Sequence, residues 1–205
     1  MHRSGPYTTA KRALDLVGTS VLLVAFSPLF GLVALCIWLD DGRPLLFTQT
    51  RAGHRGTPFR IFKFRTLTRE PGDPTRPAAH ATRVGAVLRR WALDELPQLW
   101  NVLRGEMSLV GPRPTLPEQA EQYGPHERRR LQVRPGLTGW AQIHGRNALS
   151  WPERIDLDVW YVRHRRLLLD LWILLRTPIT LVQGVGVTGT DGTNPSFSPA
   201  SRSHA

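Results

Sequence analysis

Two adjacent carboxylates, Asp94 and Glu95, stand between leucines in the stretch RWALDELPQL of residues 90–99. The chain around them is strongly basic, with 27 lysines and arginines against 16 acidic residues and a net charge of +11. A carboxylate can attack a phosphorus atom to form an acyl phosphate, and a second carboxylate can bind Mg²⁺ or accept a proton. Acidic residues and Pro97 also suit the first turn of a helix, so the residue types alone leave a purely structural role open.

Several basic residues stand in irregular, Gly- and Pro-rich surroundings close to this acidic pair. They are Arg113 in GPRP, Arg134 in RPG and Arg146 in HGRN. Arginine beside exposed backbone N–H groups commonly binds phosphate. Lys63 is one of only two lysines and lies on an expected strand, where a compact ammonium group can serve as a point charge for a phosphate. Each residue alone also fits a solvated surface position, but together they indicate a phosphorylated substrate.

Residues 17–39, VGTSVLLVAFSPLFGLVALCIWL, carry no charge. As a straight helix they would extend about 35 Å, enough for a hydrocarbon core of roughly 30 Å. Ser27-Pro28 lies in the middle and predicts a kink, because proline removes a backbone donor and clashes with the preceding turn. Basic residues flank the run on both sides, and such residues prefer the cytoplasmic side of a membrane. A helix that enters, bends at Ser27-Pro28 and returns satisfies both flanks, while a straight span and a buried soluble helix remain alternatives.

The rest of the chain predicts a mainly α protein with a small β-hairpin, an α+β fold. The expected elements are two strands within 44–67 around a turn at 53–58, a loop over 68–80, helices over 83–90, 96–104 and 118–132, an irregular turn at 111–114, a loop over 134–140, and a helical pattern over 151–182. The basic and apolar stretch 163–175 fits either an amphipathic helix in the membrane interface or an ordinary core helix. The composition from residue 186 onward predicts a disordered tail.

Long, ungapped stretches of the chain are similar to one known family. The chain resembles the bacterial sugar transferases, the small monotopic polyprenyl-phosphate phosphoglycosyl transferases. The matching stretches cover most of residues 11–180 and are KRALDL, the Ser27-Pro28 break, LLFTQTRAGHRGTPFRIFKFRTL, LRRWALDELPQLWNVLRGEMSLVGPRP, RPGLTGWAQIHGRN and DVWYVRHRRLLLDLWILLRT. Larger relatives carry extra N-terminal transmembrane helices, so this chain is expected to resemble the minimal catalytic form.

The resemblance implies an enzyme that transfers a phosphosugar from a UDP-sugar to undecaprenyl phosphate and releases UMP. This reaction is the first membrane step of exopolysaccharide, O-antigen or glycoconjugate synthesis. The family pattern implies that Asp94 is the nucleophile and carries a covalent phosphosugar. It also implies that Glu95 assists with metal binding or with deprotonation of the lipid phosphate, and that Mg²⁺, held by this pair, is required. The residues that match phosphate-binding positions are Lys63, Arg89, Arg113, Arg134 and Arg146.

The resemblance also implies a location at the bacterial inner membrane, with the catalytic domain on the cytoplasmic face. The expected fold adds a re-entrant helix-break-helix at Ser27-Pro28 and interfacial amphipathic helices. The expected segments are an N-terminal tail (1–10), a re-entrant membrane hairpin (11–40), a catalytic domain (41–185) and a disordered tail (186–205). The expected partners are the UDP-sugar, undecaprenyl phosphate and membrane lipids, without nucleic acid. A homodimer is compatible with the sequence, but no residue pattern predicts it.

The chain departs from the family pattern at Leu67, where Met is usual, at His144 for Asn, at Arg166 for Ser and at Trp172 for Lys. His144 stands beside Arg146 and could alter recognition of the sugar or nucleotide.

Two other classes of function compete with the enzyme. A non-catalytic scaffold on anionic lipids predicts a dispensable Asp94, and a nucleic-acid binder explains the charge but not the apolar segment. The sugar stays open among glucose, galactose, an N-acetylhexosamine and a diamino sugar.

Overall fold

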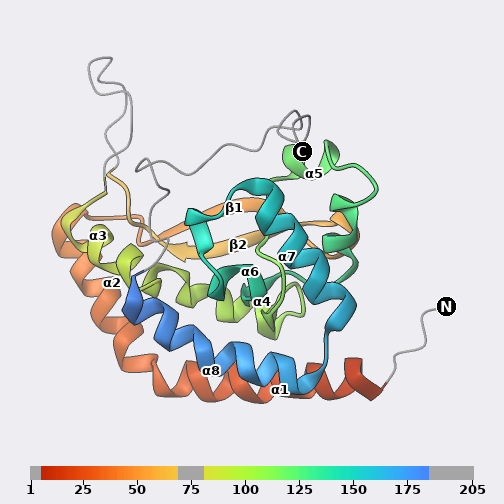
Figure 1. Ribbon diagram of the computed structural model, residues 1–205. Coiled ribbons are helices and arrows are strands. Elements are labelled where there is room, and N and C mark those ends of the chain that lie inside the picture. The colour runs from red at the N-terminus through yellow and green to blue at the C-terminus, as the bar shows by residue number, and fades with distance from the viewer. Residues whose placement is uncertain (1–5, 69–80, 185–205) are drawn as a thin grey trace.

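The computed structural model describes residues 6–68 and 81–184 of the 205-residue chain (Figure 1). The fold is mainly helical with a small antiparallel hairpin, as the sequence predicts. The α-helices are α1 Pro6–Ala25, α2 Ser27–Asp41, α3 Arg83–Arg90, α4 Leu99–Leu103, α5 Pro117–Glu121, α6 Trp140–Ile143, α7 Trp151–His164 and α8 Leu167–Gln183. The strands and short 3₁₀ helices are β1 Leu46–Ala52, β2 Pro58–Phe64, β3 Ser108–Val110, β4 Gly136–Thr138, η1 His54–Gly56, η2 Leu93–Gln98, η3 Glu127–Gln132 and η4 Arg146–Ala148.

The first two helices break at the predicted position. Phe26 separates α1 from α2, Pro28 lies in the first turn of α2, and the two helices are bent by 59°. The Ser27 hydroxyl donates to the Val24 carbonyl at 2.8 Å, which satisfies a carbonyl group at the end of α1. Within the described part of the chain, no single helix is both long and apolar enough to cross a bilayer, and only this bent pair reaches that length and composition.

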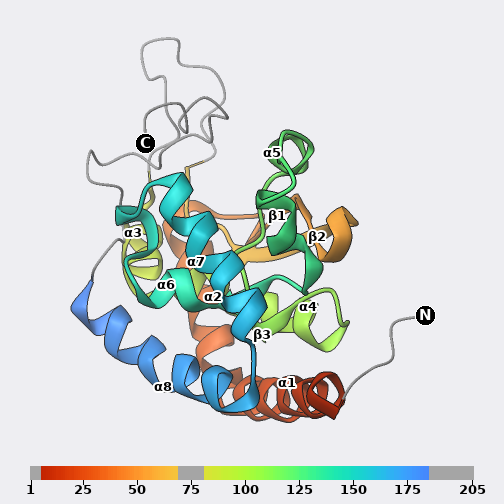
Figure 2. The same ribbon diagram turned by 45° about the vertical axis from the view of Figure 1, so that its right-hand side comes forward.

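The KRALD stretch at the start of α1 docks this helix onto the rest of the protein. Arg12 donates to the carbonyls at the end of α4, to Val102 at 2.7 Å and to Leu103 at 2.8 Å. The buried Asp15 carboxylate accepts from the Ser108 hydroxyl at 2.9 Å and from a backbone N–H of β3. Lys11 lies 3.2 Å from the fully buried carboxylate of Asp170 on α8. The Arg12 and Asp15 contacts hold α1 against α4 and β3, and the Lys11 contact holds it against the first turn of α8, where both views show the two helices side by side (Figures 1 and 2).

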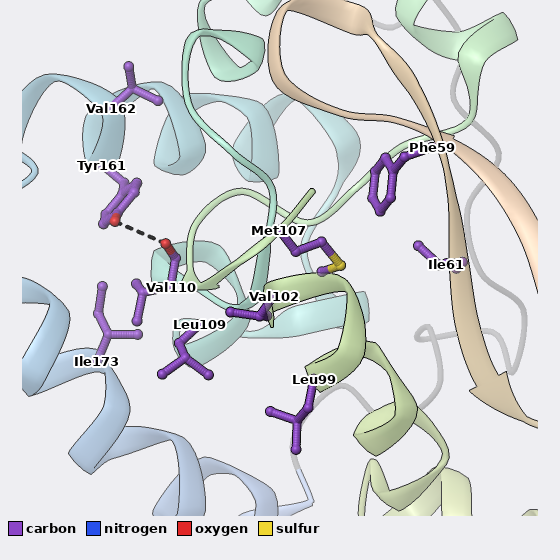
Figure 3. Packing of buried hydrophobic residues seen from close by; sticks show 10 residues of the cluster. All are labelled: Phe59, Ile61, Leu99, Val102, Met107, Leu109, Val110, Tyr161, Val162 and Ile173. Carbon is purple, nitrogen blue, oxygen red and sulfur yellow. Dashed lines mark hydrogen bonds between the residues drawn. The ribbon is translucent and has the colours of Figure 1, made fainter. Parts of the chain in front are cut away.

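A hydrophobic core lies between the hairpin and α7 and α8 (Figure 3). The hairpin pairs Leu46 with Phe64 and Ala52 with Pro58, so that Phe59 and Ile61 of β2 face the core. The buried residues that form this core are Phe59, Ile61, Leu99, Val102, Met107, Leu109, Val110, Tyr161, Val162 and Ile173. The Tyr161 hydroxyl donates to the Val110 carbonyl at 3.2 Å and so ties α7 to β3.

Apolar side chains of α1, α2 and α8 remain exposed to solvent. On α1 and α2 they include Val17, Val21, Val24, Leu32, Leu35 and Leu39, and on α8 they include Leu168, Leu171, Leu175, Ile179 and Val182. Large apolar areas of this kind mark interaction sites for proteins or membranes. Those of α8 recur at a spacing of three and four residues and therefore lie on one face of the helix.

Three predicted elements differ from the structure. The expected helix over 118–132 is divided into α5 and η3, because Gly124-Pro125 interrupts it. The expected loop over 134–140 contains β4, which pairs in parallel with β3. The expected helix over 96–104 begins as the 3₁₀ helix η2, which contains Pro97, and becomes α-helical only at Leu99.

Other predictions agree more closely. The hairpin and α3 lie where the sequence places them, and the helical pattern over 151–182 forms α7 and α8, with a break at Arg165-Arg166. Most of the expected loop over 68–80 and the expected tail from 186 lie outside the described residues.

Candidate active site

The Asp94–Glu95 pair lies in η2, immediately after a tight turn. Thr82 caps α3 by accepting from the Gly85 N–H at 2.8 Å, and α3 ends at Arg90. Ala92 then adopts a left-handed conformation with φ of 53°, which reverses the chain into η2. A left-handed alanine is strained, and such strain is common at functional sites. The turn leaves both carboxyl groups nearly buried, with Asp94 9% and Glu95 8% exposed.

Glu95 is held by two cations from separate parts of the chain. Lys63 of β2 donates to its carboxylate at 2.7 Å, and Arg113 of the GPRP turn donates to both of its oxygens. Burial by itself would raise the pKa of Glu95, but the Arg113 and Lys63 charges outweigh it and hold this pKa well below its usual range. Glu95 therefore stays ionised.

Asp94 is in the opposite situation. No hydrogen bond or ion pair reaches its carboxylate from the residues that the structure describes. Burial, and next the negative charge of Glu95, raise the pKa of Asp94 from its ordinary value of 3.8 to about 6. The cations Lys63, Arg113 and Arg89 oppose this change without cancelling it. The free carboxylate is thus destabilised as an anion, which makes it a reactive group.

A cavity of about 500 Å³ opens beside the pair. This volume is within the range of roughly 300–1,000 Å³ that small-molecule sites occupy. The structure brings six of the predicted site residues to its wall: Lys63, Arg89, Asp94, Glu95, Arg113 and Arg146. It does not bring Arg134 there, because this side chain is exposed and lies outside the set of cavity-lining residues. The RPG motif instead contributes backbone: a Cβ at Gly111 would come within 2.5 Å of the Arg134 carbonyl oxygen.

The cavity is also lined by polar residues that the sequence patterns did not single out. They are Arg51, Thr115, Gln119, Arg130, Gln142, Asn147, Arg154 and Asp158. Trp151, Arg154 and Asp158 of α7 recur at a spacing of three and four residues, which places them on one face of the helix. This spacing is visible in the sequence and could have predicted that these three residues lie together.

The cavity is electrostatically prepared for anions. Burial, and next the nearby Arg113 charge, lower the pKa values of Arg51, Arg146 and Arg154. Crowded cations of this kind are stabilised when a polyanion enters. Arg146 reaches the cavity from a backbone position with φ of 52°, directly after Gly145 with φ of 149°. It is the second strained residue at this site.

Several residues that line this cavity carry buried polar atoms without a hydrogen-bond partner. Among the described residues that line it, they are Arg51 Nε, Arg130 Nε, Gln142 Nε2 and Oε1, Arg146 Nη1 and Asp158 Oδ1. Buried polar groups are nearly always paired in folded proteins. Such a concentration indicates a site whose partners are supplied by a ligand.

The donor set for a metal ion is small. Within the described ranges, no group of three or more His, Cys, Asp or Glu side chains is placed to hold one. Asp94 and Glu95 are two adjacent oxygen donors at a cavity lined by arginines. Mg²⁺ is commonly bound by one or two carboxylates together with substrate phosphates. The residues therefore fit Mg²⁺ that arrives with a diphosphate, and they do not form a complete cage.

Three departures from the family pattern lie together, away from this cavity wall. The His144 ring lies 4.2 Å from that of Trp140, and Trp172 lies 5.5 Å from the same ring. Arg166 lines a separate hollow of about 330 Å³ with Trp140, Trp160 and Trp172. His144 is exposed and is absent from the lining of the candidate active site, whereas its neighbour Arg146 is part of that lining.

Comparison with known proteins now decides the family. The family described as "Bacterial sugar transferase" matches residues 6–184. The chain belongs to the bacterial sugar transferase family. The resemblance seen in the motifs is thereby confirmed, and the protein is a transferase.

Similar curated proteins come from several bacteria. The chain is 42% identical to the uncharacterized sugar transferase EpsL of Bacillus subtilis, over 88% of this chain and 91% of that protein. It is 45% identical to the UDP-glucose:undecaprenyl-phosphate glucose-1-phosphate transferase of Caulobacter vibrioides, over 84% of this chain and 69% of the relative. It is 38% identical to the UDP-N-acetylgalactosamine-undecaprenyl-phosphate N-acetylgalactosaminephosphotransferase of Aeromonas hydrophila, over 88% of this chain and 45% of the relative.

Proposed function

We propose that this protein transfers a sugar phosphate from a UDP-sugar to undecaprenyl phosphate and releases UMP, as the first membrane step of exopolysaccharide, O-antigen or glycoconjugate synthesis. The names of the Caulobacter and Aeromonas relatives support both substrates. The two names specify different sugars, so membership of the family does not identify the sugar that this protein transfers. The observation that carries the chemical proposal is the unpaired, buried Asp94 carboxylate at the wall of an arginine-lined cavity.

In the first step, an oxygen of ionised Asp94 attacks the phosphorus atom that carries the sugar. The new O–P bond forms as the bond from this phosphorus to the UMP oxygen breaks, and UMP leaves with the electron pair. An oxygen of the lipid phosphate then attacks the acyl phosphate, the bond to Asp94 breaks, and the carboxylate is restored. The product is a lipid-linked diphosphate sugar. The raised pKa of Asp94 supports this role, because a poorly stabilised carboxylate is a stronger nucleophile than one held by an ion pair.

Cations from four parts of the chain would hold the diphosphate during this attack. Lys63, Arg113 and Arg146 reach the cavity from β2, the GPRP turn and η4, and Arg89 joins them from α3. Charge spread over a phosphoryl group in the transition state is stabilised mainly by such fixed cations. Because Lys63 and Arg113 already pair with Glu95, this residue fixes their positions before the substrate binds.

Asp94 and Glu95 are the residues that would hold Mg²⁺, which when bound neutralises charge on the diphosphate. The low pKa of Glu95 favours the metal-binding role over deprotonation of the lipid phosphate, because a carboxylate that binds protons weakly is a poor general base.

The α1–α2 pair would enter the cytoplasmic face of the inner membrane and return to it, bent at Ser27-Pro28. The 59° bend and the exposed apolar side chains of both helices support this arrangement. Single cysteines at Thr9 and Arg43, in a Cys36→Ser background, test it with a membrane-impermeant thiol reagent. Both cysteines should be protected in spheroplasts and labelled in inverted vesicles. If one cysteine is labelled in spheroplasts and the other only in inverted vesicles, the segment is a straight span.

The activity is tested by UMP release from a panel of UDP-sugars, with Mg²⁺ and undecaprenyl phosphate, for the wild type and Asp94→Asn. Release by the wild type alone is expected. Without the lipid, the wild type should release at most one UMP per protein. Its mass should then increase by one phosphosugar, on the peptide that contains Asp94. Full activity of a folded Asp94→Asn variant would refute the covalent mechanism.

A further inference from the structure

Two of the unpartnered atoms that belong to cavity-lining residues are hydrogen-bond acceptors, in a site otherwise dominated by cations. They are Oδ1 of Asp158 and Oε1 of Gln142. Asp158 is 1% exposed, and its free oxygen has no hydrogen-bond partner among the described residues. An unpaired buried acceptor is unfavourable by about 1–3 kcal/mol unless a donor reaches it. The reaction as proposed above gives neither residue a role.

The Asp158 carboxylate is rigidly placed. Its Oδ2 atom accepts from Arg130 at 2.6 Å, and the same nitrogen of Arg130 donates to the Arg113 carbonyl at 3.0 Å. The other terminal nitrogen of Arg130 donates to the Tyr123 hydroxyl at 2.6 Å. Arg130 therefore fixes one oxygen of Asp158 and leaves the second oxygen without a partner.

Aromatic and cationic side chains line the same cavity as Asp158. Trp151 precedes Asp158 by two turns on the same face of α7. The guanidinium of Arg154 lies 5.4 Å from the centre of the Trp151 ring. Arg130 lies 6.0 Å from the same ring. The wall of the cavity here combines an aromatic surface with an acceptor, which is suited to a ring that carries hydroxyl or N–H groups.

Phosphate cannot satisfy these acceptors, because an ionised phosphate ester offers only acceptor oxygens. The donors must come from an uncharged part of the ligand. We propose that Asp158 and Gln142 bind the hydroxyl- or N–H-bearing ring of the sugar nucleotide, with Oδ1 of Asp158 and the amide of Gln142 in hydrogen bonds to it. This inference rests on the proposed function. Such groups are present both in the nucleoside and in the transferred sugar, and the experiment separates these two sources.

The test compares Gln142→Met and Asp158→Asn with the wild type and with Gln132→Met, a matched change at an exposed glutamine at the end of η3. Gln142→Met keeps the length of the side chain and removes both polar atoms. Asp158→Asn directs its oxygen to Arg130 and turns an amide donor toward the ligand. Equilibrium binding is measured with UMP and with inorganic pyrophosphate in the same Mg²⁺ buffer, and KM is measured with the best UDP-sugar.

Gln142→Met should weaken the binding of UMP, or raise KM for the UDP-sugar, by about tenfold, and leave pyrophosphate binding unchanged. Asp158→Asn should have at least as large an effect, because its lost hydrogen bond involves a charged acceptor. Weaker UMP binding identifies the nucleoside as the ligand. A raised KM with unchanged UMP binding identifies the transferred sugar.

The inference is overturned if neither value changes in Gln142→Met, or if pyrophosphate binding weakens by the same factor. Because Gln142→Met disturbs no ion pair, it decides the question even where Asp158→Asn does not fold. Wild-type protein that binds UMP but releases none from any UDP-sugar would refute the proposed function instead, and the binding comparison would still be readable.

Discussion

Substitution of Asp94 by Asn should stabilise the ligand-free protein while it abolishes activity. In the folded protein the pKa of Asp94 is raised from 3.8 to about 6, first by burial and then by the charge of Glu95. The difference between these two pKa values lowers the free energy of unfolding of the wild type by about 3 kcal/mol at pH 7. Asn cannot ionise and avoids this penalty.

The sign of the pH dependence follows from the protons that each state binds. Between about pH 4 and pH 6 the folded wild type keeps a proton on Asp94 that the unfolded chain has lost, so its stability falls as the pH rises. The difference between Asp94→Asn and the wild type should therefore be near zero at pH 4. It should increase through pH 6 and be constant above about pH 7.

Thermal unfolding in one detergent at pH 4, 5, 6 and 8 measures this difference. About 3 kcal/mol corresponds to an increase in Tm of roughly 6–12 °C for a chain of this size. Glu121→Gln, which changes an exposed carboxylate on α5, is the control and should show no such trend. A stability difference that does not vary with pH, or an Asp94→Asn variant less stable than the wild type at pH 8, would refute the reasoning.

Three further changes test the surroundings of the site. Asn101→Ala removes a fully buried amide that joins β2 to the loop after α4. It should lower the free energy of unfolding, measured by heat or denaturant, by about 2–4 kcal/mol. A loss below about 1 kcal/mol would contradict this prediction. Gly136→Ala places a Cβ against the backbone of the GPRP turn and should sharply reduce both Tm and UMP release, whereas Gly31→Ala on α2, where a Cβ meets nothing within 4 Å, should reduce neither. Glu95→Gln removes a charge that raises the pKa of Asp94, so the fall of kcat/KM at acid pH should move to lower pH, and an unchanged pH profile would argue against the coupling.

The sequence predicts well the parts of the fold that depend on local patterns. Alternating residues and a Gly-rich turn define the hairpin, and the Ser27-Pro28 break lies where proline must end a helix. It predicts less well the segments whose conformation depends on tertiary pairing. The RPGLTG stretch becomes a strand only because Ser108 and Val110 of β3, far along the chain, pair with it.

The same distinction applies to the candidate site. Arg113 and Arg146, which stand in irregular motifs, reach the cavity, but Arg134 in an equally irregular motif does not. The difference lies in what each motif contributes, since the backbone of RPG packs against Gly111 and leaves the Arg134 side chain in solvent. Asp158 was missed for the converse reason: it lies within a regular helix, where only its spacing from other polar residues distinguishes it.

The opposite states of Asp94 and Glu95 show most directly what the chain alone cannot specify. The two residues are chemically similar adjacent acids, and nothing in LDELPQ states which of them ionises more readily. In a 3₁₀ helix, with three residues per turn, neighbouring side chains diverge by about 120°. One of them therefore reaches Lys63 and Arg113, and the other is left at the cavity wall without a partner. Glu95, with the longer side chain, is the ion-paired carboxylate, and burial together with the negative charge of Glu95 raises the pKa of Asp94. Burial and the Glu95 charge thus outweigh the Lys63 and Arg113 charges at Asp94, whereas the same two cations outweigh burial at Glu95.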